Sequence, residues 1–404
     1  MLLVVLLCAG IAANSILQAQ DAHADKTLSL GGASAGSLFG PPGPQARHHC
    51  INVQDFGADP TNANDWSQAF DRAFSSAKES GYPLCVQAGI YRLSRAIAWD
   101  MRSAARTGLS IIGDGARRVI LDFTQDDVPA PNFKIFNSAP EGTFFLRMGG
   151  FAIQSNVAGA ALQIGEAAFT DPINSSVFGP LVVTNINPDP RAIGVQINYV
   201  VNSTFVQMVA NLGGPGIGLD AIQLNQSVSN TFINAAGGNC KTSLHLTNGS
   251  NYGNTFIGFD FEEATTGIAI DNANSFSNTW IGGTAASLRH FVHATAGSNN
   301  YFFNMTFGLI TNSVFEKDYG KGITLGRPSG PVPETPAIPR SGAGVANLSA
   351  QRILVYLRGG RVSSVAINGT PVFDTSNVSV ILNPDDEVRL TYTTAPEWSW
   401  FVLH

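Results

Sequence analysis

Apolar and polar positions repeat along the middle of the chain at an interval in the low twenties. The motif Asn-Thr-aromatic-Ile begins at Asn230 and returns at Asn254 and Asn278, each 24 residues further on, with a weaker copy at Asn300. An earlier, imperfect copy lies near Asn202. A second apolar phase accompanies the motif, in the segments 161–164, 194–197, 221–224, 243–246, 267–270 and 290–293.

A period of this length, with several short strand-like segments per repeat, predicts a β-solenoid in which each repeat forms one coil. Equivalent positions then lie about 4.8 Å apart on neighbouring coils. We expect the repeated asparagines to stack at a turn, to hydrogen-bond along their column and to tolerate positive φ there. A leucine-rich repeat has a similar period, but its Leu-x-Leu-x-x-Asn spacing is absent. The aromatic positions of the motif should form an internal column of Phe205, Phe232, Phe256 and Trp280.

The segment before the repeats changes from the rhythm of a strand to that of a helix. Residues 51–60 predict a strand that ends in turn residues. Apolar side chains over residues 65–80 follow the i, i+3, i+4 spacing of an amphipathic helix. Asn64 or Asp65 can cap its start, and Gly81 can supply the positive φ of its C-terminal end. Short strands interrupted by Gly and Asp follow this helix.

Three further segments define the organisation of the chain. Residues 165–192 are expected to form an insertion between two coils, as a groove wall. The proline-rich residues 326–344 predict a semi-rigid linker. Residues 345–404 show short alternating strands, with a hairpin signal at Asn368-Gly369, and predict a small all-β module.

The N-terminus predicts export. Residues 1–24 contain a short apolar run followed by Ala22-His23-Ala24, a small-x-small cleavage site, although no Lys or Arg precedes the run. The run is shorter than a membrane-spanning helix needs, which favours a cleaved signal peptide over an anchor. Residues 25–49 are rich in Gly, Pro, Ser and Ala and predict a flexible lead-in. The mature protein is therefore expected to be secreted or periplasmic, with no membrane attachment.

Composition narrows the function classes. Charged residues make up 13% of the chain and its formal net charge is -6, so no basic footprint for nucleic acid is present. Cys and His do not occur with metal-ligand spacing, and we predict no metal and no cofactor. Cys50 and Cys85 each lie beside a strand-like run and form either a disulfide or two buried thiols.

Residues 51–325 resemble the pectate-lyase-like superfamily of right-handed parallel β-helices. The resemblance is specific for fold, although Gln87 replaces the usual proline before Ala88. It implies an all-β chain: a right-handed parallel β-helix over residues 50–325 with an N-terminal capping helix. The matching residues are Asp55-Phe56-Gly57-Ala58, the helix over 65–80, Ala88-Gly89-Ile90-Tyr91 and Ile112-Gly113-Asp114-Gly115.

The repeats "NTFIG…FEE…TTGIAI" look like those of tailspike-like and glycoside-hydrolase-28-related members. The C-terminal module is similar to small β-modules that end some phage tailspike-type depolymerases. The resemblance implies polysaccharide binding, usually with lyase, hydrolase or epimerase chemistry, and a homotrimer. The epimerase motif Tyr-Gly-Phe-Asp-Pro-His and the polygalacturonase set are absent, so no catalytic residue is carried over from either group.

Acidic residues of the repeats are the first candidates for catalysis. Asp260, Glu262 and Glu263 form the densest cluster; strand alternation puts Asp260 and Glu262 on one face, and Glu263 starts a turn. Two carboxylates one or two coils apart would suit glycoside hydrolysis. The alternative is a set of solvated edge carboxylates. Asp220, after a glycine-rich loop, is either a catalytic carboxylate or a turn former.

The remaining candidates lie on neighbouring coils. His245 should point away from the core beside Gln223 and Ala269, as a base near neutral pH or simply as an exposed imidazole. Lys241 and Arg289 are candidate partners for a substrate carboxylate, with Gln223 as a further substrate-binding residue. Weaker candidates in the expected groove wall are Glu166, Asp171, Asp189 and Arg191.

These observations predict an exported polysaccharide-degrading enzyme, a lyase or a glycoside hydrolase, that binds a sugar chain along the β-helix face. The alternative is a non-catalytic carbohydrate-binding protein or phage-tailspike-type adhesin. Two close carboxylates, or a base beside a cation, would favour the enzyme, whereas a face of only Thr, Asn and Ser would favour the binder.

Overall fold

The computed structural model describes the chain from Cys50 onwards, with gaps. Nothing is described of residues 1–49, where the expected signal peptide and lead-in lie. The described ranges are 50–61, 65–102, 108–125, 127–138, 142–166, 168, 171–214, 216–297, 300–303, 305–315, 323–325, 335–349, 352–373 and 378–403.

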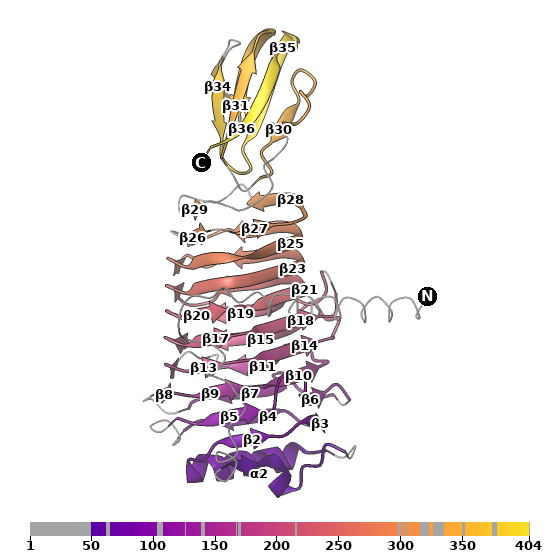
Figure 1. Cartoon of the computed structure of the whole chain (residues 1–404), viewed down its shortest axis with the longest axis vertical. Coiled ribbons are helices and arrows are strands. Elements are labelled where there is room, and N and C mark those ends of the chain that lie inside the picture. The colour runs from indigo at the N-terminus through magenta and orange to yellow at the C-terminus, as the bar shows by residue number, and fades with distance from the viewer. Residues whose placement is uncertain are drawn as a thin grey trace, which may run out of the picture. The chain divides into compact units, whose positions relative to one another are not determined.

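The described part of residues 51–325 is a parallel β-helix, as predicted, in which successive coils stack through three ladders of parallel strands (Figure 1). The first ladder contains β1 (Ile51–Asn52), β2 (Leu84–Val86), β5 (Ser110–Gly113), β9 (Arg147–Gly149), β13 (Val177–Phe178), β17 (Thr204–Val206), β20 (Thr231–Ile233), β23 (Thr255–Ile270), β25 (Thr279–Ala294), β26 (Asn300–Phe303) and β29 (Ile323–Leu325).

The second and third ladders share their longest strands with each other, because β21, β23 and β25 run through a bend. The second ladder contains β3 (Gly89–Arg92), β6 (Val119–Phe123), β10 (Phe151–Ser155), β14 (Leu181–Asn185), β18 (Met208–Leu212), β21 (Ala236–Thr247), β23, β25 and β27 (Thr306–Phe307). The third contains β4 (Ile97–Asp100), β7 (Phe133–Phe136), β11 (Ala160–Ile164), β15 (Ile193–Asn198), β19 (Asp220–Asn225), β21, β23, β25 and β28 (Ile310–Phe315). Two small sheets complete the coils: β8 (Thr143–Phe144), β12 (Ile173–Asn174) and β16 (Val200–Val201), and β22 (Asn251–Tyr252) with β24 (Ser275–Phe276).

The predicted aromatic column is confirmed and is longer than expected. Phe178 and Phe302 extend it at its two ends, in register with the predicted members. Neighbouring rings stack with centroids 4.5 to 4.9 Å apart. Every ring of the column is at most 2% exposed, so the column forms part of the core.

The asparagine column is also confirmed, but its backbone conformation differs from the prediction. Asn230, Asn254, Asn278 and Asn300 are buried, and each side-chain oxygen of the last three accepts from the backbone N–H of the preceding member at 3.0 to 3.1 Å. None of these four has positive φ. Ser229, Gly253 and Ser277, which precede the first three, do, because the chain turns one residue before each of these buried asparagines.

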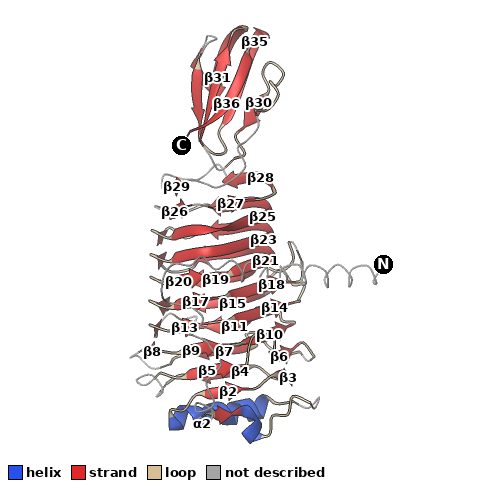
Figure 2. Ribbon diagram, viewed as in Figure 1, coloured by secondary structure: helices blue, strands red, loops and turns tan. Residues whose placement is uncertain are grey.

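A helix covers the first coil. The helix α2 (Ser67–Ser80) lies at the end of the β-helix that holds β2 and β4 (Figure 2). It buries its apolar side against β4, where Phe74 stacks on Trp99 with centroids 4.5 Å apart. Gly81 ends the helix with φ of 73°, as predicted. Asp65 accepts from the Ser67 N–H at 3.0 Å, whereas Asn64 lies outside the described residues.

Two expectations about the N-terminal half change. The strand expected over residues 51–60 is only β1, because Val53–Phe56 form a 3-10 helix that Asn52 caps. Residues 165–192 are not an insertion between coils: β12, β13 (Val177–Phe178) and β14 lie in them, in register with the coils on both sides. Cys50 and Cys85 are disulfide-bonded, and Cys240 is a buried free cysteine.

The C-terminal module is all-β, with two antiparallel sheets around a core of its own. Asn368 and Gly369 form the predicted two-residue hairpin turn with positive φ at both positions. The end of the proline-rich stretch packs onto this module, since the Pro336 carbonyl accepts from the Trp398 indole N–H at 2.7 Å. The strands are β30 (Gly344–Ala346), β31 (Arg352–Arg358), β32 (Arg361–Ile367), β33 (Thr370–Phe373), β34 (Ser379–Leu382), β35 (Glu387–Thr394) and β36 (Glu397–Leu403).

Candidate functional site

Two carboxylates point outward from the second ladder on β23. Asp260 and Glu262 alternate with Phe259 and Phe261, which are fully buried, so strand alternation places both acids on the outer face as predicted. Their neighbours in register are small. Ala236 and Thr284 flank Asp260, and Gly238 and Ala286 flank Glu262.

The surroundings of these carboxylates favour their protonated forms. Burial, and then the negative charge of Glu262, raises the pKa of Asp260 to about 7. Burial also raises the pKa of Glu262, and the charge of Glu263 adds to the shift. The buried Oδ1 atom of Asp260 has no hydrogen-bond partner among the described residues. Near neutral pH, Asp260 is therefore still partly protonated beside a second carboxyl group.

Glu263 occupies the bend that joins the second ladder to the third. Its φ is 50°, and the residues level with it on adjacent coils, Asn239 and Ser287, have similar values. The glycine-rich loop before β19 lies against this bend, because Gly214 donates to the Asn239 carbonyl at 3.1 Å. The prediction that a turn starts at Glu263 is therefore confirmed.

Two cations follow the bend. Registers on both sides place Lys241, Thr265 and Arg289 in one column of three successive coils. Lys241 and Arg289 are exposed, and no ion pair involves either of them within the described ranges. Two strand spacings separate their backbones by about 10 Å.

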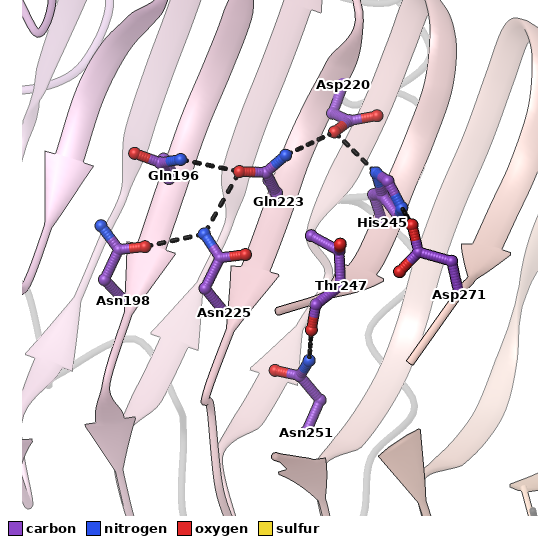
Figure 3. A network of polar contacts seen from close by, with 9 residues as sticks. All are labelled: Gln196, Asn198, Asp220, Gln223, Asn225, His245, Thr247, Asn251 and Asp271. Atoms are coloured by element: carbon purple, nitrogen blue, oxygen red, sulfur yellow. Dashed lines mark hydrogen bonds and ion pairs between the residues drawn. The ribbon is translucent and has the colours of Figure 1, made fainter. Parts of the chain in front are cut away.

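The third ladder carries a separate polar network around His245 (Figure 3). Its Nδ1 lies 2.8 Å from Oδ2 of the fully buried Asp220, and its Nε2 lies 3.0 Å from Oδ2 of Asp271. Gln223 donates to the same oxygen of Asp220 at 2.9 Å. His245 is in register with Gln223 and Ala269, as predicted. These contacts join residues of three successive coils.

The network continues along the ladder as amide-to-amide hydrogen bonds. Gln196 donates to Gln223 at 2.7 Å, and Asn225 donates to Gln223 at 3.2 Å and to Asn198 at 2.7 Å. Asp271, which holds the second nitrogen of His245, was not among the predicted residues. It lies just beyond β23, two residues after the position level with His245, where the repeat shows no signal for it.

The charge state of His245 follows from its two carboxylates. Burial lowers its pKa, but the hydrogen bond and charge of Asp220, and then those of Asp271, outweigh burial and raise the pKa above the ordinary value. Both ring nitrogens are occupied, so the imidazolium form can donate to one carboxylate on each side. His245 is thus better placed to hold coils together than to accept a proton from a substrate.

We expect the stability that His245 contributes to depend on pH. Because its pKa is raised in the folded state, this contribution is complete below the unfolded pKa and is lost as pH rises through the folded pKa. Urea unfolding from mildly acidic to mildly alkaline pH should show stability falling. His245→Gln should remove most of this dependence and cost about 2 kcal/mol at acidic pH. An unchanged pH dependence in the variant would contradict this role.

Three of the weaker candidates from residues 165–192 form ion pairs away from Asp260 and Glu262. Glu166 pairs with Lys134 at 2.8 Å, and Arg191 binds both carboxylate oxygens of Asp189 at 2.8 and 2.9 Å. Among the described residues, no group of three or more His, Cys, Asp or Glu side chains could hold a metal ion. No described helix has the length and apolar character to cross a membrane.

Comparisons with known proteins give structural likenesses only. No protein-family model matches the chain, and no curated protein matches it. The chain is similar to the mannuronan C-5 epimerase AlgE4 A-module of Azotobacter vinelandii, at 12% identity and a TM-score of 0.47, over 71% of this chain and 98% of that one. It is also similar to tailspike protein gp49 of Acinetobacter baumannii bacteriophage Fri1, a capsular polysaccharide depolymerase, at 10% identity and a TM-score of 0.44, over 87% and 88%. The enzymatically active domain of bacteriophage CBA120 tailspike protein 4 matches at 10% identity and a TM-score of 0.49, over 87% and 68%.

Proposed function

We propose that the protein is a glycoside hydrolase that cleaves an acidic polysaccharide, with Asp260 as general acid and Glu262 as general base. The observation that carries the proposal is the pair itself. Two carboxyl groups lie on the outer face of one strand, and burial raises the pKa of Asp260 to about 7. Glycosidases use such a pair: one carboxyl group stays protonated near neutral pH and acts as the acid, and the other acts as the base or nucleophile.

The proposed reaction needs only these two groups and water. Asp260 gives its proton to the glycosidic oxygen as the bond to the anomeric carbon breaks. Water attacks that carbon, and Glu262 takes the proton that the water loses. Two residues along a strand separate the two backbones by about 7 Å. We expect inversion at the anomeric carbon, which needs carboxyl groups far enough apart to admit a water molecule.

The surroundings of the pair support an acidic sugar chain as substrate. The small residues Ala236, Gly238 and Ala286 flank the acids in register. Lys241 and Arg289 present exposed cations beyond the bend. Guanidinium and ammonium groups about 10 Å apart can each bind a carboxylate of the substrate.

Hydrolysis fits the geometry better than lyase chemistry. A lyase needs a base to remove the proton next to a uronate carboxylate. His245, the candidate for that base, has both ring nitrogens occupied by Asp220 and Asp271 and a raised pKa, so it has no free lone pair to offer.

The test is to incubate the chain with acidic and neutral polysaccharides and to follow reducing ends together with ultraviolet absorbance of unsaturated sugars. New reducing ends without unsaturated products support hydrolysis. Unsaturated products would replace this proposal with a lyase. Binding without either product would replace it with the non-catalytic adhesin.

Export after cleavage at Ala24 and assembly as a homotrimer also remain proposals. The disulfide at Cys50 and Cys85 supports export, because such bonds persist in oxidising compartments. The N-terminal mass of the exported protein tests the cleavage, and sedimentation tests the trimer. An intact N-terminus or a monomer would reject the corresponding proposal.

A further inference from the structure

The outer face of one sheet in the C-terminal module is unusually apolar. In this sheet β31 lies between β34 and β36. Ile353, Val355 and Leu357 of β31 are fully buried, so strand alternation places Leu354 and Tyr356 on the opposite, outer face. This face is not covered by any described part of the module, since Tyr356 is 42% exposed.

Neighbouring strands extend this face into a flat platform. Leu354 is in register with Ile381 on one side and with Phe401 on the other. Ile381 and Phe401 are 42% and 52% exposed. Tyr356 lies in the next outward row, between Ser379 and Ser399. Two strand spacings separate the outer strands of the platform by about 10 Å.

Cations stand at both ends of the platform. Arg352 and Arg358 share the outer face of β31 with Leu354 and Tyr356, and both are exposed. Neither forms an ion pair with any residue in the described ranges. Six residues of a strand separate them by about 20 Å. The platform therefore offers an apolar middle with an arginine at each end, although Arg358 lies opposite the exposed Glu397 of β36 in the sheet register.

We propose that this platform, formed by Leu354, Tyr356, Ile381, Phe401, Arg352 and Arg358, binds a chain of acidic polysaccharide lying along β31. Aromatic rings supply a large, rigid contact area for the apolar faces of sugar rings, and Tyr356 adds a hydroxyl group. Each arginine can bind a sugar carboxylate with two parallel hydrogen bonds. The choice of a polysaccharide rests on the proposed function, but the platform is separate from the catalytic pair.

A second copy of the chain fits this face less well. In a face-to-face pair related by a twofold axis, Arg352 and Arg358 of one copy would approach the same arginines of the other. Like charges placed opposite one another across an interface oppose association. An anionic polymer instead complements Arg352, and at the other end its carboxylate can compete with Glu397 for Arg358.

The test compares full-length variants by affinity electrophoresis in gels containing polygalacturonate, alginate, hyaluronate or neutral dextran. We expect at least one acidic polymer to retard the wild-type chain and dextran not to. Tyr356→Ala with Phe401→Ala, and Arg352→Gln with Arg358→Gln, should each weaken binding about tenfold or more. The matched controls, Val372→Ala with Phe373→Ala and Arg361→Gln, change exposed residues of the other sheet and should bind as the wild type does.

Three results would overturn the proposal: no retardation by any acidic polymer, equal losses in the controls, or platform variants that change only the sedimentation of the chain. Glu262→Gln separates this proposal from the proposed function, because that variant should lose hydrolysis and keep its retardation. Conversely, platform variants should still hydrolyse short oligosaccharides, because the catalytic pair is unchanged in them. Circular dichroism of each variant confirms that it is folded.

Discussion

Glu262→Gln should lower kcat on the polysaccharide by about 100- to 10,000-fold, the usual contribution of a general acid or base. Asp260→Asn should cause a loss of the same order. Both replacements keep the shape of the side chain on an outward-facing position, so the fold should be retained. Initial rates of reducing-end formation measure the loss, and affinity electrophoresis checks that the sugar chain is still bound. A Glu262→Gln variant with wild-type kcat would exclude Glu262 as the base.

The dependence of activity on pH is a second test of the roles of Asp260 and Glu262. Activity requires protonated Asp260, so it should fall as pH rises through about 7. It also requires ionised Glu262, so it should fall as pH decreases through the raised pKa of that group. Glu263→Gln is the matched control: it should keep kcat and shift the acidic limb to lower pH, because the charge of Glu263 helps raise the pKa of Glu262.

The coils could be predicted because their interior repeats one side chain at each position. An aromatic ring at 232, 256 and 280 stacks only if each interval forms one coil, and the structure shows those rings in register. The regular period also placed His245 beside Gln223 correctly. The prediction for residues 165–192 was wrong because their strands are short and lack the Asn-Thr-aromatic motif. Phe178 nevertheless continues the aromatic column in this segment.

The candidate site was less predictable than the fold, because its burial and its hydrogen bonds depend on contacts between residues of different coils. Burial of Asp260, and the small residues Gly238 and Ala286 on each side of Glu262, depend on which residues the register brings together. Asp271 follows its strand at a position where other coils hold no acid, so no periodic signal identified it as the partner of His245. The apolar outer face of β31 could likewise not be predicted, because it depends on the register that places Leu354 between Ile381 and Phe401.

Asn254→Leu should cause the largest loss of stability among the substitutions considered, about 3 to 6 kcal/mol. The Asn254 side chain is fully buried. Its oxygen accepts from the Asn230 backbone N–H at 3.0 Å, and its amide donates to the Ser227 carbonyl at 2.8 Å and to Asn278 Oδ1 at 2.9 Å. Leucine fills a similar volume but leaves two or more of these groups buried and unpaired, at about 1 to 3 kcal/mol each.

Urea unfolding followed by circular dichroism measures this loss, and Asn274→Ala is the matched control. The Asn274 side chain is exposed in the same coil, so its removal should change stability by no more than about 0.5 kcal/mol. Each coil of a solenoid contacts only its neighbours. The loss of the Asn254 hydrogen bonds therefore weakens the contacts of its coil with both the preceding and the following coil. If Asn254→Leu unfolded at the same urea concentration as Asn274→Ala, the asparagine column would not be what holds successive coils together.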